Sequence, residues 1–291
     1  MIKLSCCTLA YIVSTPLDEA IKRIAGAGYK GLDIYTGSPH LYPAYYSTQE
    51  RKEVKNLIEK LDLELTGFAV CGGILGLQIN FSHPKKKVRD RTLQYYKDNI
   101  ELAAEIGCPL INVLTGHVLY GTSREQGRSW TMDYFQELVE VAEKKKVILG
   151  LHPQYIGDSP LMLTIDDALQ MIKELDSKIV KIIFDTAQQN ITYPNFADDI
   201  KKASRHLAYI HAADNDGIHW THLALGKGTV NWEGLVRVLK EVNYDGYLCV
   251  QTWSSSPIDA DSMIRDSKEY IEGVLSKVFK EPRIKGKLHS R

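Results

Sequence analysis

Four apolar segments in the second half of the chain each end in a polar side chain that can bind a metal ion. The segments are ILGLH, KIIFD, AYIH and YLCVQ, and their last residues are His152, Asp185, His211 and Gln251. Imidazole and carboxylate groups bind Zn2+, Mn2+ and Fe2+ well, and glutamine can add its amide oxygen as a weaker, neutral ligand. Enough chain separates each residue from the next for one helix and one further strand. Side chains that project from successive strand ends into one mouth are typical of α/β barrels.

Each of these residues also has a purely structural interpretation. A lone histidine at a strand end commonly serves only as a hydrogen-bonding residue, and a lone aspartate there commonly caps the next helix. Their occurrence at four successive strand ends favours a shared site over four unrelated roles. The sequence therefore predicts one divalent ion, such as Mn2+ or Zn2+, bound by His152, Asp185, His211 and Gln251.

Bulk properties exclude several classes of partner. The chain has 291 residues, of which 44% are apolar, enough for two average domains or one barrel. Its 36 Lys and Arg balance 36 Asp and Glu, which argues against a general nucleic-acid binder. Neither a signal-peptide pattern nor a membrane-spanning apolar run is evident. The odd number of cysteines, without a C-x-x-C pair, indicates a reducing compartment. We expect a cytoplasmic protein with no nucleic-acid or membrane partner, and a homo-oligomer is possible.

Strand-like and helix-like patterns alternate along the whole chain. Eight short apolar runs predict strands at residues 3–10, 31–35, 63–70, 110–114, 147–151, 180–184, 208–211 and 247–251. Helix starts are predicted at Thr164 and Asn231, and a long helix is predicted from Pro84 to a stop at Gly107. Eight such units favour a single closed (β/α)8 barrel over residues 1–280. The basic segment 281–291 is expected to be a docking tail or a frayed end.

Five ordered motifs resemble one known family. They are AGAGYKGLD at residues 25–33, LAAEIGC at 102–108, FDTAQ at 184–188, YIHAAD at 209–214 and LGKGTVNW at 225–232. These segments resemble the sugar phosphate isomerase/epimerase family of xylose isomerase-like TIM barrels. That family includes tagatose and psicose epimerases, inosose dehydratase and, distantly, endonuclease IV. The resemblance covers nearly the whole chain.

The resemblance implies one divalent metal ion held by Glu, Asp, His and Glu on strands five to eight. Asp185 and His211 match the middle two ligands, whereas His152 and Gln251 stand where the two glutamates are expected. In the family's epimerases those glutamates are the acid/base pair, one on each face of the sugar carbon. Two-face proton transfer needs two titratable groups. His152 can exchange a proton near neutral pH, whereas Gln251 cannot.

The resemblance implies a metal-dependent sugar isomerase or epimerase that acts on a small sugar, polyol or keto-sugar through enolate chemistry. His152 and Gln251 are the predicted catalytic residues. Neutral groups in place of two carboxylates leave the ion more positive and a stronger Lewis acid, which makes a lyase or dehydratase the first alternative. A carbohydrate-binding barrel without catalysis is the second.

Further polar and aromatic residues suit a sugar. Aromatic faces pack against the C–H faces of sugars, and amide and imidazole groups bond to hydroxyls. The predicted substrate-binding residues are Tyr35, His117, Gln154, Gln188, His222 and Trp253. By contrast, the basic cluster at residues 85–91 is interpreted as a solvated helix face, because its charge opposes the helix dipole and no aromatic residue interrupts it.

Overall fold

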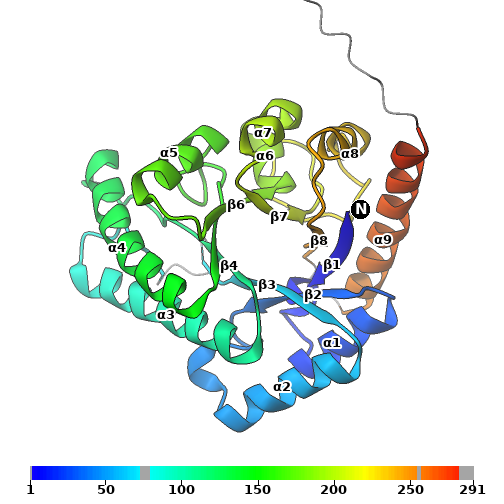
Figure 1. The fold of residues 1–291 in the computed structure, drawn as a ribbon, viewed down its shortest axis with the longest axis horizontal. Coiled ribbons are helices and arrows are strands. Elements are labelled where there is room, and N and C mark those ends of the chain that lie inside the picture. The colour runs from blue at the N-terminus through cyan, green and yellow to red at the C-terminus, as the bar shows by residue number, and fades with distance from the viewer. Residues whose placement is uncertain (1, 73–78, 254–256, 282–291) are drawn as a thin grey trace, which may run out of the picture.

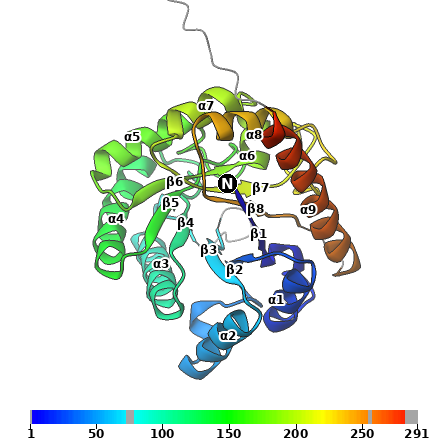
Figure 2. The ribbon, with the colours of Figure 1, turned by 45° about the vertical axis from the view of Figure 1, so that its right-hand side comes forward.

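Eight parallel strands form a closed barrel in chain order, surrounded by helices (Figures 1 and 2). The structure is a computed structural model and describes residues 2–72, 79–253 and 257–281. The strands are β1 (Lys3–Cys7), β2 (Gly31–Thr36), β3 (Glu64–Val70), β4 (Leu110–Val113), β5 (Ile148–Leu151), β6 (Val180–Asp185), β7 (Leu207–Ala212) and β8 (Tyr247–Val250). Pairing of β1 with β8 closes the sheet. The predicted (β/α)8 barrel is confirmed.

Helices follow most strands and pack on the outside of the barrel. They are α1 (Leu17–Gly26), α2 (Thr48–Lys60), α3 (Lys86–Ile106), α4 (Arg124–Lys145), α5 (Ile165–Leu175), α6 (Thr186–Thr192), α7 (Phe196–Ala203), α8 (Trp232–Glu241) and α9 (Pro257–Lys280), with short 3-10 helices at Thr8–Tyr11 and Pro43–Tyr45. None of the helices in the described ranges is long and apolar enough to cross a membrane. Residues 282–291 lie outside the described residues, so the division at 280/281 stays a prediction.

The three predicted helix ends agree with the structure. Thr164 and Asp167 form a reciprocal capping box at the start of α5. The side chain of Asn231 accepts a hydrogen bond from the N–H of Gly234 at the start of α8. Gly107 ends α3 in the left-handed region, with φ of 88°, which glycine adopts without steric cost.

The predicted first strand is too long. β1 ends at Cys7, and residues 8–11 form a 3-10 helix instead of continuing to residue 10. The thiol of Cys7 accepts a hydrogen bond from the N–H of Leu9 and so helps to start that turn. Residues in both elements are buried, and a continuous apolar run cannot distinguish a buried strand from a buried helical turn.

The interpretation of residues 85–91 as a solvated face is wrong for Arg89. This side chain is buried, its guanidinium lies 4.3 Å from the ring centroid of Trp130, and it donates a hydrogen bond to the carbonyl of His83. Helical periodicity turns Arg89 inward, and the aromatic partner comes from α4, far along the sequence.

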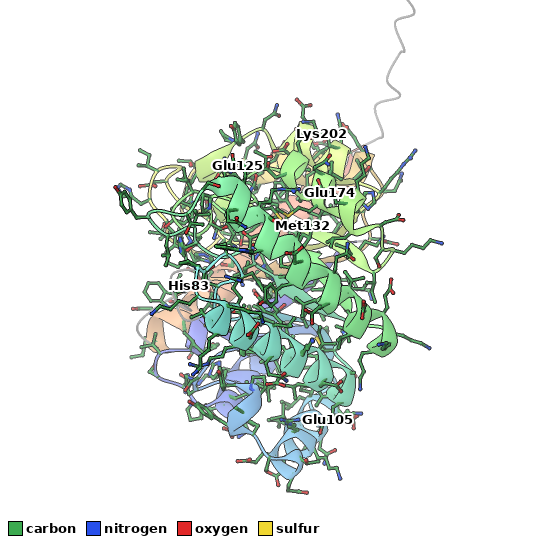
Figure 3. All side chains as sticks on the ribbon, turned by 90° about the vertical axis from the view of Figure 1, so that its left-hand side faces the viewer. His83, Glu105, Glu125, Met132, Glu174 and Lys202 are labelled. Carbon is green, nitrogen blue, oxygen red and sulfur yellow. The ribbon has the colours of Figure 1, made fainter. Side chains whose placement is uncertain are left out.

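The outer faces of these helices carry ion pairs. Glu105 on α3 and Glu174 on α5 extend outward and pair with arginines of neighbouring helices (Figure 3).

The barrel encloses a small interior core that is partly polar. Its apolar members include Leu110, Ile183 and Tyr209, and they form a cluster separate from the larger core between strands and helices. The hydroxyl of Tyr209 hydrogen-bonds to Ser5 (2.9 Å) and Thr66 (2.6 Å). These three buried hydroxyl groups are therefore bonded to one another.

Asp214 fixes the long loop between β7 and α8. Its buried carboxylate accepts hydrogen bonds from the N–H groups of Gly226 (2.9 Å) and Val230 (3.1 Å) and from the indole N–H of Trp232 (2.8 Å). These donors belong to the loop and to the first residue of α8. One side chain therefore holds the loop against the barrel.

We predict that Asp214→Ala lowers the free energy of unfolding by about 3 kcal/mol, because the buried N–H of Val230, the buried indole N–H of Trp232 and the N–H of Gly226 lose their acceptor. Urea unfolding measures this loss. The exposed Asp245→Ala is the matched control, and its effect should stay within about 0.5 kcal/mol. Equal stability of the two variants would contradict the assignment.

Candidate active site

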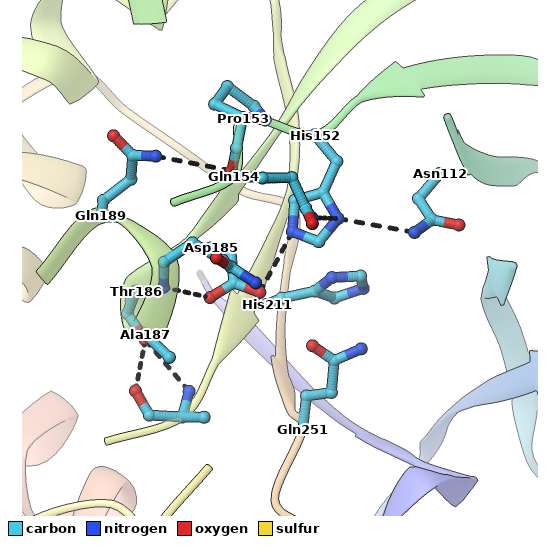
Figure 4. Close-up of polar contacts among 12 residues, drawn as sticks. Asn112, His152, Pro153, Gln154, Asp185, Thr186, Ala187, Gln189, His211 and Gln251 are labelled. Carbon is cyan, nitrogen blue, oxygen red and sulfur yellow. Dashed lines mark hydrogen bonds and ion pairs between the residues drawn. The ribbon is translucent and has the colours of Figure 1, made fainter. Parts of the chain in front are cut away.

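Three strand-end side chains meet at the carboxyl end of the barrel (Figure 4). His152 follows β5, Asp185 ends β6, and His211 lies in β7, directly opposite Asp185 in the strand pairing. One potential ligand atom from each of the three lies within 4.8 Å of the others, and all three residues are buried. Adjacent parallel strands thus bring together residues that are distant in the sequence.

Hydrogen bonds define the protonation of His152. Its Nε2 lies 3.1 Å from Asp185 Oδ2, and its Nδ1 lies 3.4 Å from Asn112 Nδ2 and 3.3 Å from Gln154 Nε2. The amide oxygen of Asn112 is taken by the N–H of Val70, so its NH2 group faces the ring. An NH2 group only donates, so Nδ1 accepts and the proton sits on Nε2, which donates to Asp185.

Burial and this contact set the charges of the pair. Burial lowers the pKa of His152, and the neighbouring Asp185 opposes that shift only in part. Burial raises the pKa of Asp185, but the hydrogen bond from His152 and the electrostatic effect of the three histidines His152, His222 and His211 together outweigh it, and the resulting pKa is about 2. At neutral pH a neutral imidazole therefore donates to an ionised carboxylate.

His211 presents both ring nitrogens without a hydrogen-bond partner among the described residues. Its ring lies edge-on to that of His152, 5.1 Å between centroids. Buried polar atoms are nearly always paired, and an unpaired imidazole beside a carboxylate is a good ligand for a divalent ion. Asp185 and His211 therefore fit a metal ion. His152 could bind the same ion through Nε2 only after the proton on Nε2 had moved to Nδ1.

His152 and Asp185 line a cavity of about 60 Å3, whose wall also includes most of the predicted sugar-binding residues. Its polar and aromatic lining is Tyr35, Asn112, His152, Gln154, Asp158, Asp185, Gln188, Trp220, His222, Gln251 and Trp253. The side chain of Gln251 points toward the ring of His211 (Figure 4). The volume holds a few water molecules, whereas sugar-sized sites take about 300 Å3 or more. Side chains at the mouth must move apart to admit a sugar.

Two of the lining residues have well-defined hydrogen bonds. Gln188 accepts from the N–H of Tyr155 (2.9 Å) and donates to Asp158 (3.1 Å), so its amide is held in the wall. His222 Nδ1 lies 2.8 Å from the carbonyl oxygen of Gln251. A carbonyl only accepts, so Nδ1 donates, and the buried Nε2 of His222 has no partner among the described residues.

The structure does not bring His117 into this lining. Its backbone carbonyl instead accepts hydrogen bonds from Asn80 and Ser82, which tie down the loop after β4. Sequence reasoning missed Asn112 and Asp158. A lone asparagine within the apolar strand LINV was a usable signal for Asn112, whereas Asp158 lies in a loop with no periodicity to reveal its burial.

The pKa values predict acid sensitivity. In the folded protein the pKa values of His152 and Asp185 both lie below their ordinary values. The unfolded chain therefore binds more protons than the folded one, and the free energy of unfolding falls as pH falls. For Asp185 the window runs from its ordinary pKa of 3.8 down to about 2. That stabilisation amounts to about 2 kcal/mol.

We expect Asp185→Asn to remove this part of the pH dependence, measured by urea unfolding of the metal-free protein at several pH values between about 5 and 2. Asp245→Asn, an exposed substitution, should retain the parent slope. A slope unchanged by Asp185→Asn would be inconsistent with the His152–Asp185 contact.

Comparison with known proteins agrees with this architecture. Residues 21–274 match the family described as Xylose isomerase-like TIM barrel. The chain is 26% identical to an uncharacterised protein of Methanocaldococcus jannaschii over 92% of this chain and 89% of that protein. It is 25% identical to the D-psicose 3-epimerase of Enterocloster bolteae over 77% of this chain and 72% of the relative. A crystal structure of a D-tagatose 3-epimerase-like protein superposes with a TM-score of 0.80 at 24% identity, covering 95% of this chain and all of the other. The chain belongs to the xylose isomerase-like TIM barrel family.

Proposed function

We propose that this protein is a metal-dependent sugar isomerase or epimerase that moves a proton at the carbon next to the carbonyl of a small keto-sugar. The observation that carries the proposal is the buried group of His152, Asp185 and His211 at the barrel mouth. Membership of the family and the sugar epimerase among its relatives support the substrate class.

Asp185 and His211 would hold one divalent ion such as Mn2+ or Zn2+, and the amide oxygen of Gln251 could complete the site as a neutral ligand. The bound ion would polarise the substrate carbonyl and stabilise the developing enolate oxygen. His152 is the proton-transferring residue in this proposal: burial keeps it neutral, and Asp185 and Asn112 fix its ring.

His222 is our candidate for the second proton-transferring residue. Sequence reasoning gave it only a substrate-binding role and left one titratable group where epimerisation needs two. His222 lines the same cavity as His152, and its Nε2 has no hydrogen-bond partner in the part of the chain that the structure describes, so two imidazoles are available. This pair favours epimerisation over the alternative, β-elimination by a lyase, which can proceed with one base.

Removal of metal should abolish turnover. We predict that Asp185→Ala and His211→Ala each weaken Mn2+ binding at least about 100-fold, because each deletes a direct ligand. Isothermal titration calorimetry measures the affinity, and conversion of D-psicose and other ketoses measures activity. His219→Ala, at an exposed imidazole in the β7–α8 loop, is the control and should match the parent. Parent-like Mn2+ affinity in both variants would refute this metal site.

The second imidazole can be tested separately. We predict that His222→Gln still exchanges the proton next to the ketose carbonyl with deuterated solvent but forms at least about 100-fold less epimer, since one face loses its proton donor. Proton NMR follows both quantities in one sample. His219→Gln should behave like the parent.

Loss of exchange and epimer together in His222→Gln would show that His222 does not act on one face alone. An elimination product from the parent would favour the lyase. Sugar affinity without exchange on any ketose would favour a carbohydrate-binding barrel.

A further inference from the structure

We infer that Asp33 orients His211 for metal binding, by accepting the Nε2 proton and leaving Nδ1 free to face the ion. This inference rests on the proposed metal site. Asp33 Oδ2 lies 3.7 Å from His211 Nε2, and both atoms are buried without a hydrogen-bond partner among the described residues. Asp33 lies on β2, on the opposite side of the barrel from the strands that carry the proposed ligands.

The barrel backbone is shaped to place this carboxylate inside. The pairing of β2 with β3 shifts register between Leu32 and Asp33, so that Asp33 lies opposite Gly67. Such irregularities redirect a side chain. Gly67 supplies the space, because a Cβ atom there would lie 2.6 Å from Asp33 Oδ2. A similar shift in the pairing of β6 with β7, between Ile182 and Ile183, precedes His211 on the partner strand.

The Cys7 thiol and His211 both lie next to the Asp33 carboxylate, and His211 is the basic group of the two. The other carboxylate oxygen, Oδ1, accepts a hydrogen bond from the N–H of Ala69 at 3.2 Å. Within the described residues, His211 is the basic side chain within ion-pair distance of Asp33. A fully buried carboxylate is costly unless it is paired, so Oδ2 needs the proton that His211 Nε2 can offer.

This contact determines which nitrogen can bind metal. A neutral imidazole carries one proton, and a carboxylate acceptor at Nε2 keeps the proton there, so the lone pair stays on Nδ1. Carboxylates behind metal-binding histidines commonly raise the basicity of the ring and fix its orientation. Asp33 would also add a second negative charge near the ion, behind His211, while Asp185 is the carboxylate that contacts the ion directly. Asp33 is therefore a positioning residue, since it acts through His211.

Asp33→Asn gives a sharp test, because the N–H of Ala69 selects the orientation of the new amide. Its oxygen should take that N–H, which turns its NH2 group toward His211 and forces Nε2 to accept. The proton should then move to Nδ1 and block the proposed ligand atom. We expect the 15N spectrum of histidine-labelled, metal-free protein to show an Nε2–H tautomer for His211 in the parent and Nδ1–H in the variant. Mn2+ binding should weaken about 10–100-fold by calorimetry.

Two further variants complete the test. Gly67→Ala keeps the charge of Asp33 but displaces Oδ2, and should also weaken Mn2+ binding by at least about 10-fold; it decides the question if Asp33→Asn does not fold. Asp214→Asn, another buried aspartate next to β7, should lower stability and leave Mn2+ affinity and the His211 tautomer unchanged.

The outcomes separate the two proposals. A parent that binds no divalent ion would refute the metal site, while the metal-free spectra would still report on Asp33. An Nδ1–H tautomer in the parent, or Mn2+ affinity within about 2-fold of the parent in both Asp33→Asn and Gly67→Ala, would overturn the role of Asp33.

Discussion

The hydrogen bonds between β1 and β8 close the sheet, and the chemistry of the molecule depends on that closure. Cys6 pairs with Val250 and Ser5 with Cys249, so the first and last strands are neighbours. In a closed parallel barrel all strands end at one face, and side chains from opposite strands approach each other across the interior. Asp33 on β2 can therefore lie 3.7 Å from His211 on β7. An open sheet would keep these strands apart.

Polar groups extend from the mouth of the barrel down into its interior. His152 and Asp185 lie at the cavity, His211 lies beside them, and the ring of Tyr209 meets His211 edge-on at 5.5 Å. The hydroxyl of Tyr209 is in turn bonded to Ser5 and Thr66. The ring of His152 thus packs on that of His211, and the ring of His211 packs on that of Tyr209. Such support keeps side chains in one geometry before a ligand arrives, which is how barrels position reacting groups.

The sequence predicted the barrel, its strands apart from the end of the first, and three helix ends, because these depend on local periodicity and capping. It also predicted that His152, Asp185 and His211 share one mouth, since strand order fixes which ends are adjacent. It could not predict the burial of Arg89 against Trp130, or the pairing of Asn112 with Val70 and His152, because these contacts join residues far apart in the chain. The tautomer of His222 depends on a hydrogen bond to the backbone carbonyl of Gln251, which no sequence pattern reveals.

Asn112 couples the framework of the barrel to the chemistry at its mouth. The backbone pairing of β3 with β4 is short, with Phe68 opposite Ile111, and beyond it the amide oxygen of Asn112 takes the N–H of Val70. The NH2 group of the same amide determines the tautomer of His152. Mutational effects at this position are therefore inherently non-additive with those at His152. Position 112 is therefore under two constraints in evolution. A replacement for Asn112 must accept the N–H of Val70 on β3 and also donate a hydrogen bond to the imidazole of His152.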